Sequence, residues 1–136
     1  MNAHAKYQAQ LDQLHTIHHW IRENLRSCGL DEINILKVEL ACEETLVNII
    51  LHGYKGSDGI IELDIRGGDK VEIEFRDAAP SFNPLEKEVG FDPLATLEER
   101  KIGGLGIMMI RQYVDDLRYE RKDGKNILTL IKRIKP

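Results

Sequence analysis

The chain has 136 residues, of which 42% are hydrophobic and 31% charged, a balance typical of one globular domain that we expect to span residues 1–136. Its 19 basic and 23 acidic residues give a net charge of −4, which argues against a nucleic-acid-binding protein. No run approaches the ~20 apolar residues of a membrane-spanning helix, and the first twenty residues lack the apolar core of a signal peptide. We therefore expect a cytoplasmic protein that binds neither nucleic acid nor a membrane.

The first half of the chain predicts a short edge strand and two helices. The edge strand is expected at residues 6–9. Apolar residues recur at steps of three and four over residues 11–27, and Cys28 and Gly29 provide a stop. The second helix begins after Asp31, a good N-cap, and ends at Gly53. Its apolar positions, which we expect the sheet to bury, are Ile35, Leu36, Leu40, Val47 and Leu51.

The second half predicts two antiparallel strand pairs separated by a helix. Residues 60–65 and 71–75 alternate between apolar and polar side chains on either side of a glycine-containing turn. A helix at about residues 105–113 is followed by strands near residues 116–121 and 126–133. An Asp-Gly pair between these last two strands predicts a tight hairpin turn.

Residues 77–101 show no clean periodicity, and three prolines interrupt them. A loop this long inside a small domain is uncommon and is usually functional or disordered. Helices stacked on one face of a mostly antiparallel sheet would bury all the apolar stripes at once. We therefore expect an α+β two-layer sandwich.

The second helix carries the first group of chemically interesting residues. Glu44 and Asn48 lie four residues apart and thus on nearly the same helical face, with His52 one turn further, whereas Glu43 points about 100° away. A carboxylate beside an amide oxygen suits a magnesium–phosphate site, because the amide ligates Mg²⁺ and the carboxylate can polarise an attacking hydroxyl. The alternative is an exposed polar pair with no function.

The second group follows the predicted strand that ends at Phe75. It is the segment Asp77-Ala78-Ala79-Pro80-Ser81-Phe82-Asn83-Pro84. An aspartate at the end of a buried strand can accept a hydrogen bond from an exocyclic amine, as recognition of adenine requires. An ordinary polar turn is the alternative, since Asp, Asn and Pro are common turn residues.

The third group is Gly103-Gly104-Leu105-Gly106-Ile107, directly before the third predicted helix. Glycines there let backbone amides approach an anion, and the helix N-terminus adds unpaired N–H groups. Arg100 and Lys101 add positive charge nearby. A flexible hinge is the alternative, and the glycine spacing fits neither a P-loop nor a dinucleotide-binding fingerprint.

The three groups together would hold magnesium and phosphate, adenine and the phosphate tail of one nucleotide. In this order they resemble the motifs of the GHKL ATPase superfamily and, within it, the bacterial anti-sigma serine kinases of the RsbW type. The segment 44–54 is similar to the N box, 77–84 to the G1 box and 103–106 to the G2 box. The resemblance covers about residues 11–133.

This resemblance implies a Bergerat-type fold and transfer of phosphate from Mg-ATP to a serine of an anti-anti-sigma partner of the STAS type. It also implies sequestration of a sigma factor in a partner-switching pathway, and homodimerisation. By motif position, Glu44 is expected to be the general base, Asn48 the magnesium ligand and Asp77 the reader of the adenine amine. The further nucleotide-binding residues implied are His52, Ala79, Phe82, Arg100, Lys101, Gly103, Gly104, Leu105, Gly106, Ile107 and, as a weaker candidate, Thr129 on the last strand.

The chain departs from the family pattern at Ala79, where the G1 box usually has glycine. Its methyl group is expected to crowd the nucleotide and to affect affinity more than fold. Two other functions stay open: a module that sequesters its partner without kinase activity, and a slow ATPase that releases inorganic phosphate. His15 and His19 are one helical turn apart, but we expect a solvated or partner-facing stripe there rather than a metal site, because no third ligand is near.

Overall fold

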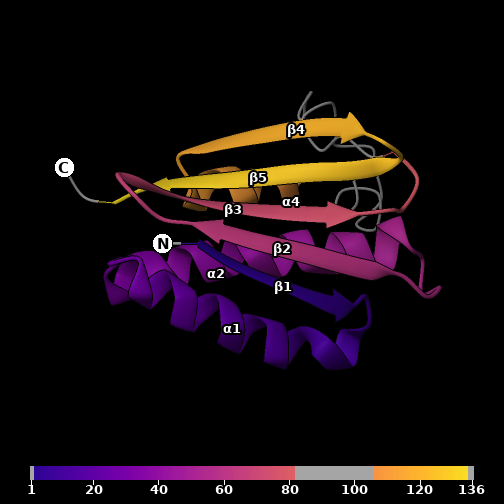
Figure 1. Cartoon of the computed structure of the whole chain (residues 1–136), viewed down its shortest axis with the longest axis horizontal. Helices are drawn as coiled ribbons and strands as arrows, with labels where there is room; N and C mark the ends of the chain where they lie inside the picture. Colours follow the sequence, from indigo (N-terminus) through magenta and orange to yellow (C-terminus); the bar gives the residue numbers. More distant parts are fainter. Residues whose placement is uncertain (1, 82–105, 135–136) are drawn as a thin grey trace, which may run out of the picture.

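The structure is a computed structural model that describes residues 2–81 and 106–134. Its elements are β1 (Asn2–Gln8), the 3-10 helix η1 (Leu11–Gln13), α1 (Leu14–Ser27), α2 (Glu32–Val47), the π-helix η2 (Asn48–Gly53), β2 (Ile60–Arg66), β3 (Lys70–Asp77), α4 (Gly106–Tyr113), β4 (Asp116–Lys122) and β5 (Lys125–Arg133). The five strands form an antiparallel sheet in the order β1-β2-β3-β5-β4, and the helices cover one of its faces (Figure 1). The expected α+β two-layer architecture is confirmed.

The two long helices begin and end where local sequence signals predict. The Asp31 side chain accepts a hydrogen bond of 2.8 Å from the backbone N–H of Asn34, which caps the N-terminus of α2. Gly29 follows the C-cap of α1 with φ = +94°, a conformation that glycine adopts without steric cost. On α1, the expected apolar stripe is buried at Ile17, Ile21 and Leu25.

The strand pairing brings the end of β3 against the start of β5. β2 and β3 form the expected hairpin, and β4 and β5 are joined by Asp123 and Gly124, whose φ angles of 52° and 76° suit a type I′ turn. β5 then inserts between β4 and β3, so that Asp77 pairs with Asn126 in the register. Two residues 49 positions apart thus become cross-strand neighbours.

The sequence prediction for the buried face of α2 was partly wrong. Ile35 is buried as expected, but Leu36 and Leu40 are 58% and 39% exposed, and Leu51 in η2 is 43% exposed. The core-facing side chains of α2 are Ile35, Val38, Ala41, Cys42, Thr45 and Leu46. Between Ile35 and Leu46 the buried positions are therefore occupied by side chains smaller than leucine, while Leu36 and Leu40 lie on the outer side of the helix.

The helix layer is also held together by charge. Arg22 of α1 donates to Glu39 of α2, with 2.9 Å between Nη2 and Oε1, and His18 of α1 contacts the carboxylate of Glu43.

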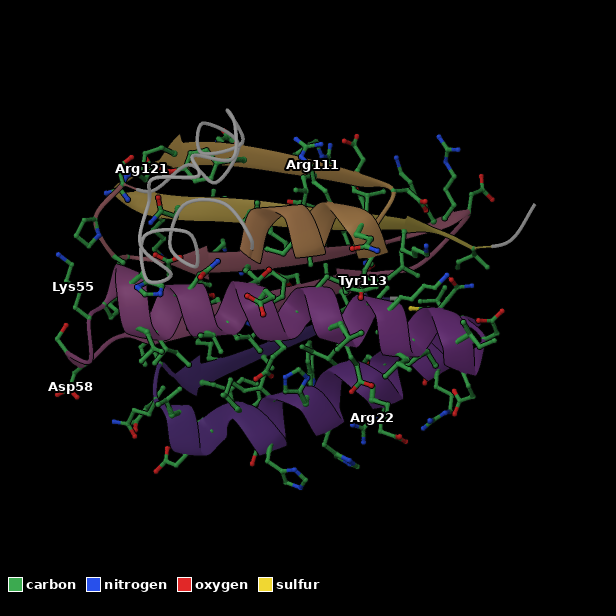
Figure 2. All side chains as sticks on the ribbon, turned by 180° about the vertical axis from the view of Figure 1, so that it is seen from behind. Arg22, Lys55, Asp58, Arg111, Tyr113 and Arg121 are labelled. Atoms are coloured by element: carbon green, nitrogen blue, oxygen red, sulfur yellow. The ribbon has the colours of Figure 1, made fainter. Side chains whose placement is uncertain are left out.

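Figure 2 shows α2 lying between α1 and α4 on the helix-covered side of the sheet. Within the described residues, no helix combines the length and the apolar character that crossing a membrane would require.

Candidate functional site

Glu44 and Asn48 lie one turn apart where α2 passes into η2. The backbone N–H of Asn48 donates to the Glu44 carbonyl, as the α-helical spacing predicts, and both side chains are half-buried. The neighbouring Glu43 points toward α1 and pairs with His18. The structure therefore separates two adjacent glutamates, one bound in the helix–helix contact and one on the face shared with Asn48.

The helix widens directly after Asn48. The segment Asn48–Gly53 is a π-helix, and the N–H of Tyr54 donates to the carbonyl of Ile49 over 2.8 Å. Such single π turns are rare and often occur at functional sites. The sequence predicts regular α-helix here, whereas the wider π turn rotates the chain less per residue and so shifts the half-buried His52 away from the position that an α-helical turn from Asn48 would give it.

The end of this helix contacts the second motif directly. The backbone N–H of Ala78 donates to the Tyr54 hydroxyl over 2.7 Å. A Cβ atom built on Gly53 would lie only 3.1 Å from the Cβ of Ala79, which is 2% exposed. The methyl group of Ala79 therefore packs against the helix end. The structure brings the first and second motifs together, as the sequence predicts.

Asp77, the last residue of β3, is buried with 6% of its surface exposed. Its Oδ1 atom accepts hydrogen bonds from the Ala79 N–H, at 3.0 Å, and from Asn126 Nδ2, at 2.9 Å. Burial raises the pKa of Asp77, against the opposing effect of these two donors and of the Arg121 charge. Its Oδ2 atom receives no hydrogen bond from any described residue. A buried carboxylate oxygen to which no described residue donates fits a ligand that carries an N–H donor, such as the amine of adenine.

Asn126 is a residue of the candidate site that sequence reasoning missed. Its side chain, 5% exposed, lies between β3 and the turn that follows it. Nδ2 lies 2.9 Å from Asp77 Oδ1, 3.2 Å from the Ala79 carbonyl and 3.1 Å from the Pro80 carbonyl. Asparagine is uncommon within strands, and Asn126 has the same strand parity as the core residues Leu128 and Leu130. A polar residue at a core-facing strand position was the signal that could have identified it.

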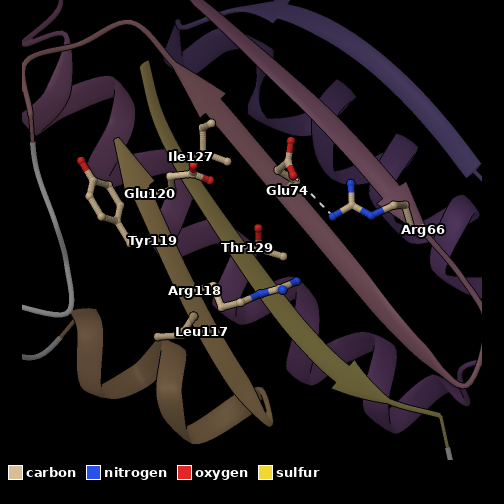
Figure 3. Close-up of a pocket in the computed structure, with 8 residues that line it drawn as sticks. All are labelled: Arg66, Glu74, Leu117, Arg118, Tyr119, Glu120, Ile127 and Thr129. Carbon is tan, nitrogen blue, oxygen red and sulfur yellow. Dashed lines mark hydrogen bonds and ion pairs between the residues drawn. The ribbon is translucent and has the colours of Figure 1, made fainter. Parts of the chain in front are cut away.

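Thr129 does not join the candidate site. It lies three positions beyond Asn126 on β5, so its side chain emerges from the opposite, helix-free face of the sheet. There it lines a pocket of about 620 Å³ together with Glu74 and Arg118 (Figure 3). The structure therefore does not favour the predicted contact of Thr129 with adenine. Because Thr129 is an odd number of residues from Asn126 along β5, the two side chains lie on opposite faces of the sheet.

The third motif lies mostly outside the described residues, as do Phe82, Arg100, Lys101, Gly103, Gly104 and Leu105. Gly106 is the first residue of α4, with Ile107 next to it. α4 packs beside α2 on the helix-covered face, as Figure 2 shows. The end of the glycine motif thus enters the same helix layer that carries Glu44 and Asn48.

A magnesium ion at this site would depend on Asn48 and on the ligand. Among the described residues, no group of three or more His, Cys, Asp and Glu side chains could hold a metal ion. Mg²⁺ usually binds to one or two protein ligands and completes its shell with water and substrate phosphates. The half-buried amide of Asn48, one turn from Glu44, fits such a shared role.

Residues 7–132 match the family described as "Histidine kinase-like ATPase domain". The anti-sigma F factor of Thermoanaerobacter sp. (strain X514) is 33% identical over 97 residues, which cover 69% of this chain and 66% of that protein. The serine/threonine-protein kinase BtrW of Bordetella bronchiseptica is 31% identical over 100 residues, 71% of this chain and 69% of that protein. The serine-protein kinase RsbW of Bacillus subtilis is 30% identical over 103 residues, which cover 71% of this chain and 62% of that protein.

The chain thus spans slightly less than two thirds of the Thermoanaerobacter and Bacillus proteins. Its fold is similar to a crystal structure of the RsbU and RsbW domains of a Mycobacterium tuberculosis protein. The TM-score is 0.66 at 20% identity, over 100% of this chain and 33% of that one. At this level of identity the likeness concerns the fold.

Proposed function

Because the chain belongs to the family of histidine kinase-like ATPase domains, we propose that it binds ATP between α2 and the end of β3 and phosphorylates a serine of a partner protein. The proposed partner is an anti-anti-sigma protein of the STAS type. In this proposal the chain also sequesters a sigma factor, and phosphorylation of the partner decides which of the two proteins it holds. The names of its relatives, anti-sigma F factor and serine-protein kinase RsbW, support this assignment.

The observation that carries the proposal is the state of Asp77. A carboxyl group that is 6% exposed would be costly to bury unless its oxygens were satisfied. One oxygen accepts two hydrogen bonds from Asn126 and Ala79, and the other has no described donor. A ligand amine supplies the missing donor, and the contact of Gly53 with Ala79 puts this group beside the helix that bears Glu44.

Each proposed role follows from the position and the chemistry of the side chain. Asp77 accepts a hydrogen bond from the adenine amine, and Asn48 offers its amide oxygen to Mg²⁺. Glu44 accepts the proton of the serine hydroxyl. ATP supplies the phosphoryl group, and its transfer depends chiefly on positioning and on charge stabilisation, so the chain needs no nucleophile of its own. With a net charge of −4, the chain requires local positive charge for the phosphates, for which Arg100 and Lys101 are the proposed source.

A binding module without kinase activity is the second candidate function. Ala79 is the feature that favours it, because an added methyl in the G1 box was expected to crowd the nucleotide. In the structure this methyl packs against Gly53. Because the methyl group is accommodated within the protein, Ala79 is a weak argument against nucleotide binding, and the kinase stays the first candidate.

A transfer assay with radiolabelled ATP and a STAS-type partner tests the proposal. We expect phosphoserine on the partner, and a loss of at least ~100-fold in transfer rate for Glu44→Ala with an unchanged affinity for ADP. Glu43→Ala is the matched control, because Glu43 is the adjacent glutamate but contacts His18, and it should retain transfer. Asn48→Ala should lose binding of Mg-ATP as well as transfer.

The other outcomes separate the alternatives. Transfer at the wild-type rate by Glu44→Ala would show that the assigned base is wrong. Binding of ATP and partner without phosphoserine would support the sequestering module, and release of inorganic phosphate without an acceptor would support a slow ATPase.

We further propose that residues 1–136 act as one domain, in the cytoplasm, and as a homodimer. The described strands belong to one sheet, which supports the first point. The dimer is implied by the family resemblance, and sedimentation equilibrium of the purified chain measures it directly.

A further inference from the structure

The side chain of Asn126 lies at the centre of a buried polar cluster at one end of the sheet. Its three neighbours on the Nδ2 side are all acceptors: Asp77 Oδ1, the Ala79 carbonyl and the Pro80 carbonyl, between 2.9 and 3.2 Å away. On the other side, the Tyr119 hydroxyl donates to Asn126 Oδ1. This pattern fixes the orientation of the amide, because reversing it would point its oxygen at three acceptors.

The backbone register makes this contact a fixed feature of the sheet. Asp77 and Asn126 are paired residues of β3 and β5, so their side chains emerge side by side on the helix-covered face. The pair lies at the end of β3, where the chain leaves the sheet for the turn at Ala79 and Pro80. Arg121 of β4 adds a second tie to this turn, since its guanidinium donates to the Ala79 carbonyl over 2.8 Å.

We propose that Asn126 is the positioning residue for recognition of adenine: it holds Asp77 so that one carboxylate oxygen stays bound within the protein and the other faces the nucleotide. This inference rests on the proposed function, in which Asp77 reads the adenine amine. In this inference Asn126 acts through Asp77 and through the turn, so it is a positioning residue and not a catalytic residue.

The physical reason is the freedom that Asp77 would otherwise have. Without Asn126, the carboxyl group keeps, among the described residues, only the Ala79 N–H as a hydrogen-bond donor and can rotate about its side-chain bonds. A carboxylate that accepts fewer hydrogen bonds is also less easily ionised, and burial already disfavours its charge. Both effects weaken a contact with an amine and leave the contacts with phosphates unchanged.

Calorimetric titration with two nucleotides tests this role. ADP carries the exocyclic amine, whereas inosine diphosphate has a carbonyl oxygen in its place. We expect the wild-type chain to bind ADP at least ~10-fold more tightly than inosine diphosphate, and Asn126→Ala to reduce this preference to about twofold by weakening ADP alone. Thr129→Val is the matched control, because Thr129 is equally buried on the same strand but faces the opposite side of the sheet, and it should retain the full preference.

The outcomes distinguish this inference from the proposed function. If the wild-type chain binds neither nucleotide, the proposed function fails and this inference fails with it. If the wild type prefers ADP and Asn126→Ala keeps the preference, or loses both nucleotides equally, Asn126 has no positioning role and the proposed function stands. Should circular dichroism show that Asn126→Ala does not fold, Tyr119→Phe replaces it, since it removes only the hydroxyl that orients the amide. Tyr119→Phe should reduce the preference for ADP over inosine diphosphate two- to threefold. An unchanged preference would overturn the inference.

Discussion

The contact between Gly53 and Ala79 joins two motifs that are distant in sequence, and it leads to a double-mutant prediction. A Cβ atom on Gly53 would lie 3.1 Å from the Ala79 Cβ. Non-bonded carbon atoms prefer separations of about 3.5–4.0 Å, so Gly53→Ala forces one partner to move by roughly half an ångström. Ala79 is 2% exposed and has little room to yield.

The expected energies have opposite signs in the two backgrounds. Overpacking of a buried site costs about 1–3 kcal/mol, whereas alanine in place of a helical glycine contributes about 0.5–1 kcal/mol of stability. In the wild-type background we therefore expect Gly53→Ala to destabilise the protein by about 1 kcal/mol. In the Ala79→Gly background the methyl group is gone, and the next atom, the Asn48 carbonyl oxygen, is 3.7 Å away. There Gly53→Ala should stabilise the protein by about 0.5–1 kcal/mol.

Urea unfolding followed by circular dichroism measures all four proteins of this cycle. The predicted coupling of about 1–3 kcal/mol exceeds the ~0.3–0.5 kcal/mol within which independent sites add. If Gly53→Ala changed the unfolding free energy equally in both backgrounds, the two motifs would not meet at this contact. The same proteins test the site, because Ala79→Gly should leave ADP affinity within threefold. A much tighter complex would mean that the methyl group crowds the nucleotide, as expected from the sequence.

Two further predictions concern groups away from the nucleotide. Burial raises the pKa of the Cys42 thiol, so less of the reactive thiolate forms at a given pH. At pH 8 we therefore expect a thiol reagent to modify Cys42 at least ~1,000-fold more slowly in the folded protein than in the unfolded chain. The absorbance of the released chromophore measures this rate. Comparable rates would contradict the burial of Cys42. At Asp64, burial works against ionisation, but hydrogen bonds from Arg76 and His4 outweigh it and lower the pKa. The stability that this pairing contributes is present above the ordinary pKa of aspartate and is lost as the pH falls through the lowered pKa of Asp64. The urea concentration at the unfolding midpoint should therefore decrease less between about pH 5 and pH 3 in Arg76→Leu than in the wild-type protein. An unchanged slope would contradict the pairing.

The fold was largely predictable because its elements carry strong local signals. Residues 61–65 and 71–75 alternate strictly, and the Asp123-Gly124 pair suits the type I′ turn that the structure has. Asp31 caps α2 as its sequence context predicts. These signals depend on neighbours within a few residues, so they survive without knowledge of the tertiary structure.

The outer side of α2 was not predictable from periodicity, because this helix is apolar on more than one side. Leu36 and Leu40 follow the helical period as well as Val38 and Cys42 do, yet only the second pair is buried. What decides between them is which side of the helix faces the sheet. That orientation is set by tertiary packing, and the periodicity of a helix that is apolar on more than one side does not specify it.

The same limit explains why Thr129 was predicted and Asn126 was missed. A position on the last strand can be assigned from the sequence, but the face on which its side chain emerges depends on register, and a shift of one residue reverses it. The register of β3 with β5 is set by long-range pairing across 49 residues, from Asp77 to Asn126. Once Asp77 is known to be buried, however, its need for a donor restricts the choice: Asn126 offers an N–H at a core-facing position, whereas Thr129 emerges on the helix-free face. The hydrogen-bond requirement of the buried carboxyl therefore points to Asn126 as a candidate site residue, whereas strand position alone points to Thr129 on the opposite face of the sheet.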